Sequence, residues 1–354
     1  MSRTAKPATE PGPNSPSPRN ILIIRLRRIG DIVMTTPAVG ALRLAFPEAT
    51  ITYLVEEPFR RLVEGHPDID RVIAVPEKQT AAGMAALIGR VRKAGFDTIV
   101  DFHGGPRAFL IALFSGAKRK IGYAVKYKSF IYDVKIPRGR PEGPIHSVEN
   151  HLNLVKALGV KAAEAPPLKL AGAAAQEVLR INRIWEENRL AGSKVIAVHV
   201  GAGNEFRDWG GENWAALAEN LGRTAGIRVV LVGGEADRER EKEILSRTEG
   251  RAMSLVGRLN LAELGEALSR AFLFIGPDSG PMHIAAASRI PIVALFGPTL
   301  PAHFAPWRAQ AVLLEKRLDC RPCRQRECSY RDFRCLRGIT VEEVLAAARR
   351  HLDP

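Results

Sequence analysis

The sequence predicts an α/β protein of two Rossmann-like, doubly wound domains that face a central cleft. The chain has 354 residues, which is too long for one ordinary core and suits two domains of about 150–170 residues each. Short apolar, β-branched runs alternate with helical stretches, a pattern typical of βαβ units and a parallel sheet. The pattern starts again after a long helical stretch at 173–190, so we expect the fold to occur twice.

The expected strands of the first half are 21–26, 50–55, 71–75, 98–101 and 119–123, and a helix-like segment follows the first of them to about Phe46. The expected strands of the second half are 195–200, 229–232, 272–275 and 292–296. In doubly wound sheets, ligands bind beyond the carboxyl ends of the strands. The loops that follow these runs are therefore the expected positions of functional side chains.

The chain is expected to have five parts. They are a disordered tail at 1–19, a first domain at 20–170, a linker helix at 171–190, a second domain at 191–338 and a C-terminal helix at 339–354. The first 20 residues contain five prolines and no apolar run, so they do not read as a signal peptide. No run approaches the ~18–20 apolar residues that span a bilayer. These features favour a cytoplasmic, reducing setting.

The charge is strongly basic, with 52 Lys and Arg against 38 Asp and Glu, a net charge of +14. A surplus of this size favours polyanionic partners: nucleic acid, an anionic membrane surface or a phosphorylated substrate. It also serves solubility, and composition does not choose among these roles. The hydrophobic fraction of 46% and the charged fraction of 25% exclude general disorder.

The sharpest motif is the loop 276–280 between an apolar strand and a short helix that has Pro281 in its first turn. A helix N-terminus after such a loop offers unpaired N–H groups and a partial positive charge, which bind diphosphates. Asp278 either caps the loop or accepts hydrogen bonds from sugar hydroxyls. His283 either donates to a phosphate or packs within the helix.

A second candidate is Asp31, which follows the first strand and Gly30 at the start of a helix. A carboxylate at the carboxyl edge of the sheet can act as a general base that takes a proton from an attacking hydroxyl. The alternative is a structural N-cap. A dinucleotide fingerprint at 201–206 fails, because Phe206 stands where the last glycine is required. Arg207, just beyond, is either a ligand for a leaving diphosphate or a surface arginine.

Three segments together resemble the heptosyltransferase family, the ADP-heptose:lipopolysaccharide heptosyltransferases of glycosyltransferase family 9, over about residues 20–350. The first is 21–36 with its Gly-Asp turn, which looks like the family's opening strand and catalytic turn. The second runs from Asp101-Phe102-His103-Gly104-Gly105-Pro106-Arg107 to Ile121-Gly122-Tyr123 and is similar to its acceptor-side segment. The third is Asp278-Ser279-Gly280-Pro281-Met282-His283 followed by Phe296-Gly297-Pro298-Thr299, which looks like its donor signature.

The resemblance implies a GT-B fold and an inverting transfer of heptose from ADP-heptose to the lipopolysaccharide inner core, with no required cofactor. It implies Asp31 as the base. It implies a donor site of Asp278, Ser279, Gly280 and His283, with Asp237 near the ribose-binding position and Leu259 near the adenine-contacting one. One departure is Arg207, which stands two residues before Trp209 where the family usually has lysine; arginine keeps the charge but not the compact ammonium.

The basic surplus then fits an anionic glycolipid acceptor of the lipid A–Kdo type at the inner face of the inner membrane. The side chains expected to meet its phosphates and carboxylates are Arg27, Arg28, Arg107 and Lys120. The departing diphosphate is expected to be stabilised by the helix N-terminus at 279–283 and by Arg207, in place of a metal. The protein is accordingly expected in the cytoplasm, peripheral to that membrane.

The four cysteines are Cys320, Cys323, Cys328 and Cys335. Their compact spacing has the form of a structural zinc or iron–sulfur site, and the alternative is free thiols or adventitious disulfides. The segment is also rich in arginine, which suits a contact with phosphate or membrane.

Three other functions are also compatible with the sequence. They are a transferase for another nucleotide-sugar in cell-envelope glycan synthesis, a GT-B sugar-nucleotide epimerase, and a basic nucleic-acid-binding protein. The last leaves the donor motif unexplained, and we expect no nucleic acid as partner. The failed glycine fingerprint disfavours an NAD(P)-dependent reductase.

Overall fold

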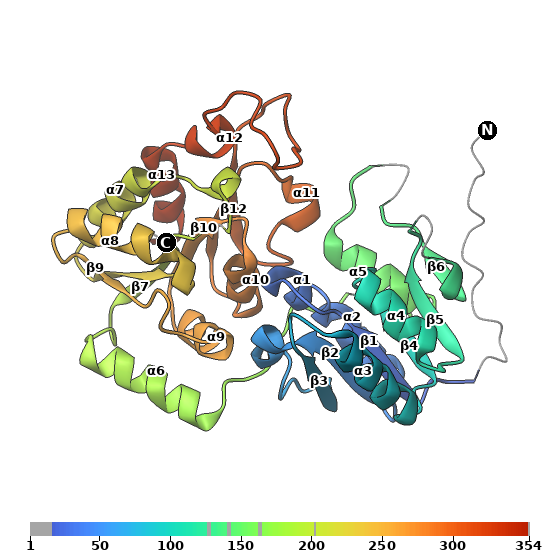
Figure 1. Cartoon of the computed structure of the whole chain (residues 1–354). Coiled ribbons are helices and arrows are strands. Elements are labelled where there is room, and N and C mark those ends of the chain that lie inside the picture. The colour runs from blue at the N-terminus through green and yellow to red at the C-terminus, as the bar shows by residue number, and fades with distance from the viewer. Residues whose placement is uncertain (1–15, 126–128, 140–142, 162–164, 202, 353–354) are drawn as a thin grey trace. The chain divides into compact units, whose positions relative to one another are not determined.

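The computed structural model describes residues 16–352 except 126–128, 140–142, 162–164 and 202, so most of the expected N-terminal tail lies outside the described residues. The chain divides into two compact units, unit 1 from Met1 to Ala171 and unit 2 from Gly172 to Pro354. Each unit is built on one six-stranded parallel sheet with helices packed against it (Figure 1). The α/β class with two doubly wound sheets is thereby confirmed.

The sheet of unit 1 has the strand order β3-β2-β1-β4-β5-β6. Its strands are β1 (Asn20–Ile24), β2 (Thr50–Glu56), β3 (Arg71–Val75), β4 (Thr98–Asp101), β5 (Arg119–Tyr123) and β6 (Val134–Ile136). Its helices are α1 (Ile29–Val33), α2 (Thr36–Ala45), η1 (Glu57–Leu62), α3 (Ala81–Lys93), α4 (Pro106–Phe114), η2 (Ser129–Ile131) and α5 (Ser147–Lys156). The single helix expected to about Phe46 is therefore two helices; Pro37 lies in the first turn of the second, where a missing N–H costs nothing.

The sheet of unit 2 repeats this topology, with the order β12-β11-β10-β7-β8-β9. Its strands are β7 (Lys194–His199), β8 (Ile227–Val232), β9 (Ala252–Ser254), β10 (Leu273–Pro277), β11 (Ile292–Phe296) and β12 (Ala311–Glu315). Its helices are α6 (Ala175–Glu187), η3 (Glu205–Arg207), α7 (Gly211–Gly222), η4 (Glu235–Asp237), α8 (Arg238–Arg247), α9 (Leu261–Ser269), α10 (Gly280–Ala287), α11 (Pro301–Phe304), α12 (Arg334–Arg337) and α13 (Val341–Leu352).

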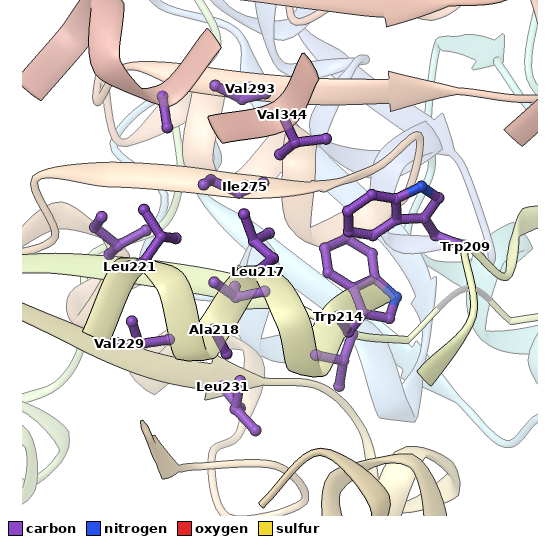
Figure 2. Close-up of a cluster of buried hydrophobic side chains, with 14 of the residues drawn as sticks. Trp209, Trp214, Leu217, Ala218, Leu221, Val229, Leu231, Ile275, Val293 and Val344 are labelled. Carbon is purple, nitrogen blue, oxygen red and sulfur yellow. The ribbon is translucent and has the colours of Figure 1, made fainter. Parts of the chain in front are cut away.

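Two helices expected to lie between or beyond the domains pack within unit 2. Helix α6, in the expected linker, lies on α9, where Arg180 pairs with the buried carboxylate of Glu263 at 2.6 Å. Helix α13 packs on α7 and the sheet and buries Val344 in the core (Figure 2).

The core of unit 2 is built around two tryptophans. Trp209 and Trp214 are fully buried and meet edge to face, with ring centroids 4.6 Å apart (Figure 2). The Trp209 indole N–H donates to the Ile339 carbonyl at 2.7 Å, so its polar atom has a partner in the apolar interior. This bond ties the loop after β7 to the start of α13.

Each sheet reverses its strand order at one point. In unit 1 the reversal lies between β1 and β4, and in unit 2 between β7 and β10. The loops that leave adjacent strands at such a switch point diverge to opposite faces of the sheet and leave a crevice at its carboxyl edge, where ligands bind. The loops after β1 and β4, and those after β7 and β10, are thus placed for function. Among the described residues, no helix is long and apolar enough to cross a membrane.

Candidate active site

Asp31 lies at the switch point of unit 1, paired with an arginine that the sequence did not single out. Arg25 follows β1 and is buried, and its guanidinium forms an ion pair with the Asp31 carboxylate. The same guanidinium donates from Nη1 to the Phe102 carbonyl after β4, at 2.8 Å. Arg25 thus connects the two switch-point loops and holds Asp31, whose side chain stays 26% exposed.

The interpretation of Asp31 as a helix N-cap is wrong. Helix α1 starts at Ile29, so Asp31 lies inside its first turn and Arg28 occupies the cap position without a side-chain capping bond. Arg28 has the unusual φ of 74°, a left-handed conformation that is strained for a residue with a side chain. The carboxylate therefore does not cap the helix, and its ion-pair partner is Arg25.

A cluster of arginines surrounds His103 in the loop after β4. Burial, followed by the charges of Arg25, Arg27, Arg107 and Arg138, lowers the pKa of His103 to about 4. The imidazole is therefore neutral at pH 7 within a strongly cationic surrounding. Two of the expected acceptor ligands, Arg27 and Arg107, belong to this cluster, which suits an anionic substrate.

The structure does not bring Lys120 to the cluster. Lys120 is the second residue of β5 and pairs with Ile99 early in β4, so it lies toward the amino end of its strand, whereas Asp31 follows a carboxyl end. Its backbone N–H donates to the Asp133 carboxylate at 2.8 Å. Arg28 is exposed beside Arg27.

A buried carboxylate, the first residue of the segment similar to the family's acceptor side, shapes the same loop. Asp101 ends β4 at 0% exposure, and it accepts hydrogen bonds from the backbone N–H groups of His103 and Gly104 at 2.7 and 2.9 Å. The Tyr132 hydroxyl donates to its other oxygen. Burial raises the pKa of Asp101, and these hydrogen bonds oppose the rise. The arrangement fixes the turn that carries His103.

At the switch point of unit 2, Asp278 is buried and engaged by two residues from other elements. The Thr299 hydroxyl donates to its carboxylate at 2.6 Å. Arg207, after β7, donates to its carbonyl at 3.1 Å and lies 3.8 Å from its carboxylate. The interpretation of Asp278 as an N-cap is wrong, because Ser279 takes the cap position of α10. Gly280 is the first residue of this helix.

Ser279 and His199 form a further contact in this site. The Ser279 hydroxyl lies 3.1 Å from Nδ1 of His199, the last residue of β7, and that ring stacks on Phe274. Burial lowers the pKa of His199 to about 4, so the ring is neutral at pH 7. His283 is 2% exposed inside α10. Because Ser279 makes no side-chain cap bond, the first N–H groups of α10 are not engaged by its own cap residue, as an anion site requires.

Asp237 lines a pocket of about 470 Å³ at the carboxyl edge, next to Gly203, Asp208 and Arg240. Its carboxylate accepts from the Gly234 N–H at 2.7 Å, and burial raises its pKa. Leu259 is half-buried just before α9 and does not line this pocket in the described part of the chain.

The cysteine segment, residues 320–335, braces the switch-point loops of unit 2. The Gln325 side-chain oxygen accepts from Arg207 Nε at 3.2 Å and from the Asn204 amide at 3.0 Å. Arg321 donates to the Thr299 carbonyl at 2.8 Å, and the Cys323 N–H donates to the Pro298 carbonyl at 3.0 Å. The segment therefore holds both residues that engage Asp278.

The four cysteines are half-buried free thiols. Within the described ranges, no three His, Cys, Asp or Glu side chains are gathered so that they could hold a metal ion. Burial raises the pKa of Cys335. A zinc or iron–sulfur site at these positions stays a prediction from their spacing.

Two parallel, doubly wound units in one chain are the architecture of the GT-B class of glycosyltransferases. The fold matches the structure of ADP-heptose lipopolysaccharide heptosyltransferase II from Escherichia coli, with a TM-score of 0.78 and 21% identity over 94% of this chain and 98% of that one. It also matches a glycosyl transferase family 9 structure from Veillonella parvula, with a TM-score of 0.83 and 25% identity over 94% and 97% of the two chains.

The family follows from the sequence comparison. The model of glycosyltransferase family 9 (heptosyltransferase) matches residues 84–333. Lipopolysaccharide heptosyltransferase 3 of Escherichia coli is 25% identical over 92% of this chain and 97% of its own length. The lipopolysaccharide core heptosyltransferase OpsX of Haemophilus influenzae is 25% identical over 82% of each chain. The chain belongs to glycosyltransferase family 9, the heptosyltransferases, and is a glycosyltransferase.

Proposed function

We propose that this enzyme transfers a heptose from ADP-heptose to an anionic acceptor of the lipopolysaccharide inner core, with inversion and with Asp31 as the general base. The pair formed by Arg25 and Asp31 carries the proposal, because it places a held, partly exposed carboxylate at the switch point of unit 1. The names of the relatives, which are lipopolysaccharide heptosyltransferases, support the sugar and the acceptor. Family membership also favours transfer over epimerisation or nucleic-acid binding.

The proposed step is a single displacement. Asp31 takes the proton of an acceptor hydroxyl, whose oxygen attacks the anomeric carbon from the face opposite the diphosphate. The bond between that carbon and the phosphate oxygen breaks, and ADP leaves with the electron pair. The step requires the Asp31 carboxylate, the acceptor hydroxyl and the anomeric carbon of the donor to come together.

The leaving diphosphate gathers negative charge, which unit 2 is proposed to stabilise without a metal or other cofactor. The start of α10, from Ser279 and Gly280, supplies N–H groups and the positive end of the helix dipole. Arg207 adds a guanidinium oriented by Gln325 and by the Asp278 carbonyl. Preorganised hydrogen-bond donors of this kind stabilise the charge that develops in the transition state. Asp237, in its pocket, is proposed to accept from the ribose hydroxyls.

On the acceptor side, the cluster around His103 is proposed to bind phosphate or carboxylate groups of the glycolipid. Arg27 is exposed, and Arg107 is held by an ion pair with Glu56 and by the carbonyl of Glu77 at 2.9 Å. Such an acceptor places the enzyme at the inner face of the inner membrane. The proposal predicts that charge-removing changes at Arg27 raise the KM for the acceptor but not for the donor.

Asp31→Asn tests the base directly. The amide keeps the size of the side chain but cannot accept the proton, so we expect kcat to fall by about 10²–10⁴ while the affinity for ADP changes little. Turnover is measured with ADP-heptose and a deacylated inner-core acceptor, and ADP binding by calorimetry. Glu48→Gln, an exposed carboxylate of the same unit, is the matched control. Transfer at the normal rate by Asp31→Asn would refute the assignment.

A ligand panel tests the donor. A ligand that binds only the folded state raises the melting temperature, so ADP and ADP-heptose should stabilise the protein at concentrations where UDP, GDP and their sugars do not. Stabilisation by UDP-sugars alone would overturn the donor assignment. Stabilisation by an ADP-hexose in preference to ADP-heptose would support transfer of a different sugar in cell-envelope synthesis.

A further inference from the structure

Helix α4 of unit 1 is apolar on faces that a helix in water usually keeps polar. Its sequence after the first two residues is AFLIALF. Ala108, Ile111 and Ala112 are buried against the sheet, while Leu110, Leu113 and Phe114 are exposed on another side. These last three are spaced i, i+3 and i+4, so they share one face. A helix that is hydrophobic all round normally has a partner on each side.

The short helix η2 extends this exposed surface. Phe130 is 69% exposed, and its ring lies edge-on to Phe109 of α4 with centroids 5.7 Å apart. Val125, also exposed, approaches Gly104 in the loop that precedes α4. Of the nine large apolar side chains exposed in the described part of the chain, five lie here: Leu110, Leu113, Phe114, Val125 and Phe130. We call these five residues the α4 face.

Basic side chains border the α4 face at its far end. Helix α3 packs beside α4 and ends with exposed Arg90, Arg92 and Lys93. The stem of Arg92 lies beside Gly116, just after α4, and Lys118 follows there, exposed. None of these four cations has an ion pair among the described residues. Unit 1 carries 26 basic and 15 acidic side chains, a net charge of +11, whereas the whole chain has a net charge of +14.

We propose that the α4 face is the site at which this enzyme binds an anionic lipid bilayer, an inference that rests on the proposed glycolipid acceptor. Apolar side chains with a border of unpaired cations fit a surface of acyl chains under negative headgroups. A second copy of this chain fits less well, because two such borders repel each other.

The position of the face explains its use. Helix α4 begins at the carboxyl edge of the sheet, one residue before Arg107 of the acceptor cluster, and Val125 approaches the loop of His103. The apolar surface therefore starts within about one helical turn, about 5 Å, of the residues proposed to bind the acceptor. A bilayer on this face brings a lipid-anchored acceptor to the cluster without extracting its acyl chains.

Vesicle sedimentation tests the proposal with the whole protein. We expect binding to phosphatidylcholine vesicles that contain about one-third phosphatidylglycerol, weak binding to pure phosphatidylcholine, and loss of binding as salt screens the charges. Leu113→Ser/Phe114→Ser should weaken binding by about tenfold or more. Arg92→Gln/Lys118→Gln should weaken it by about fivefold per residue, on anionic vesicles only. All four positions are exposed, so the fold should survive.

The matched control is Leu44→Ser, which changes the 78% exposed leucine of α2 in the same unit and should leave vesicle binding unchanged. Equal binding by the Leu113→Ser/Phe114→Ser variant and the wild type overturns the proposal, and so does the absence of wild-type binding. Concentration-dependent dimerisation that this variant abolishes would identify a second copy instead. Transfer to a deacylated, soluble acceptor separates the membrane-binding proposal from the proposed function. This transfer should proceed at the wild-type rate in the variants. If the wild type does not catalyse it, that result counts against the proposed function alone.

Discussion

The pair of Arg25 and Asp31 shows how a single side chain acquires a role from its neighbours. A lone aspartate after a strand is compatible with a cap or with a base, and the local sequence does not separate these. The ion pair with a buried arginine, itself bonded to the Phe102 carbonyl, fixes where the carboxylate points. Removing one partner of such a pair leaves the charge of the other without a counter-charge in a site that water solvates poorly. Arg25 is therefore a positioning residue for the proposed base.

A residue-scale prediction concerns Thr299, whose hydroxyl donates to the buried carboxylate of Asp278. Thr299→Val keeps the shape of the side chain but removes the hydroxyl that donates to Asp278. We therefore expect the free energy of unfolding to fall by about 1–3 kcal/mol. The affinity for ADP should also fall, because Asp278 reorients. Urea unfolding and calorimetry with ADP measure the two effects. Thr248→Val is the control, because it deletes a buried hydroxyl bonded to the Leu245 carbonyl away from the donor loops. If both variants bind ADP like the wild type, Thr299 has no role in the donor site.

At the scale of elements, the cysteine segment is a brace on the loops of the proposed donor site. It contains little regular structure, yet its side chains and backbone bond to Arg207, Thr299 and Pro298. Zinc or iron at the four cysteines would fold this segment more tightly, since metal binding adds to folding free energy. Elemental analysis of protein purified without a polyhistidine tag checks this expectation, and the lack of stoichiometric metal would contradict it.

The brace predicts an effect of Gln325→Ala. Without the amide oxygen, Arg207 Nε loses its bond to the segment, so the guanidinium samples more orientations. The KM for the donor should rise roughly three- to tenfold, as expected for the net loss of one ordinary hydrogen bond of about 1 kcal/mol. The melting temperature should change little. Glu327→Ala, exposed in the same segment, is the control. An unchanged donor KM would show that Arg207 is held without Gln325.

For the whole molecule, buried neutral histidines predict loss of stability in acid. Burial lowers the pKa of His199 to about 4, below the unfolded value near 6.5, so the unfolded chain binds a proton that the folded chain excludes. Stability from this group is complete above about pH 6.5 and is lost as pH falls toward 4. For His199 alone the loss between about pH 7 and pH 5 is roughly 2 kcal/mol. Burial also lowers the pKa values of His151 and His66.

Urea unfolding followed by tryptophan fluorescence measures this effect in unit 2, because all four tryptophans of the chain lie there, as does His199. The His199→Gln variant should lose less stability than the wild type between the two pH values. The same pH dependence in both proteins would contradict the assignment to His199.

Local patterns in the sequence determined the fold class, most of the strands and the loops that carry Asp31 and Asp278, because β-branched runs, glycine turns and helix starts are signals within a few residues. The edge strands β6 and β9 escaped because each has only three residues, too few for a recognisable pattern. The edge strand β12 was also not predicted, although its sequence AVLLE is apolar. The tertiary structure alone decided that Asp31 pairs with Arg25, that Asp278 bonds to Thr299 rather than capping α10, and that Gln325 holds Arg207. Partners of the kind that engage Asp278 and Arg207 lie far apart in the chain, so no local pattern encodes them, and only the packing of the sheets and loops brings them within bonding distance.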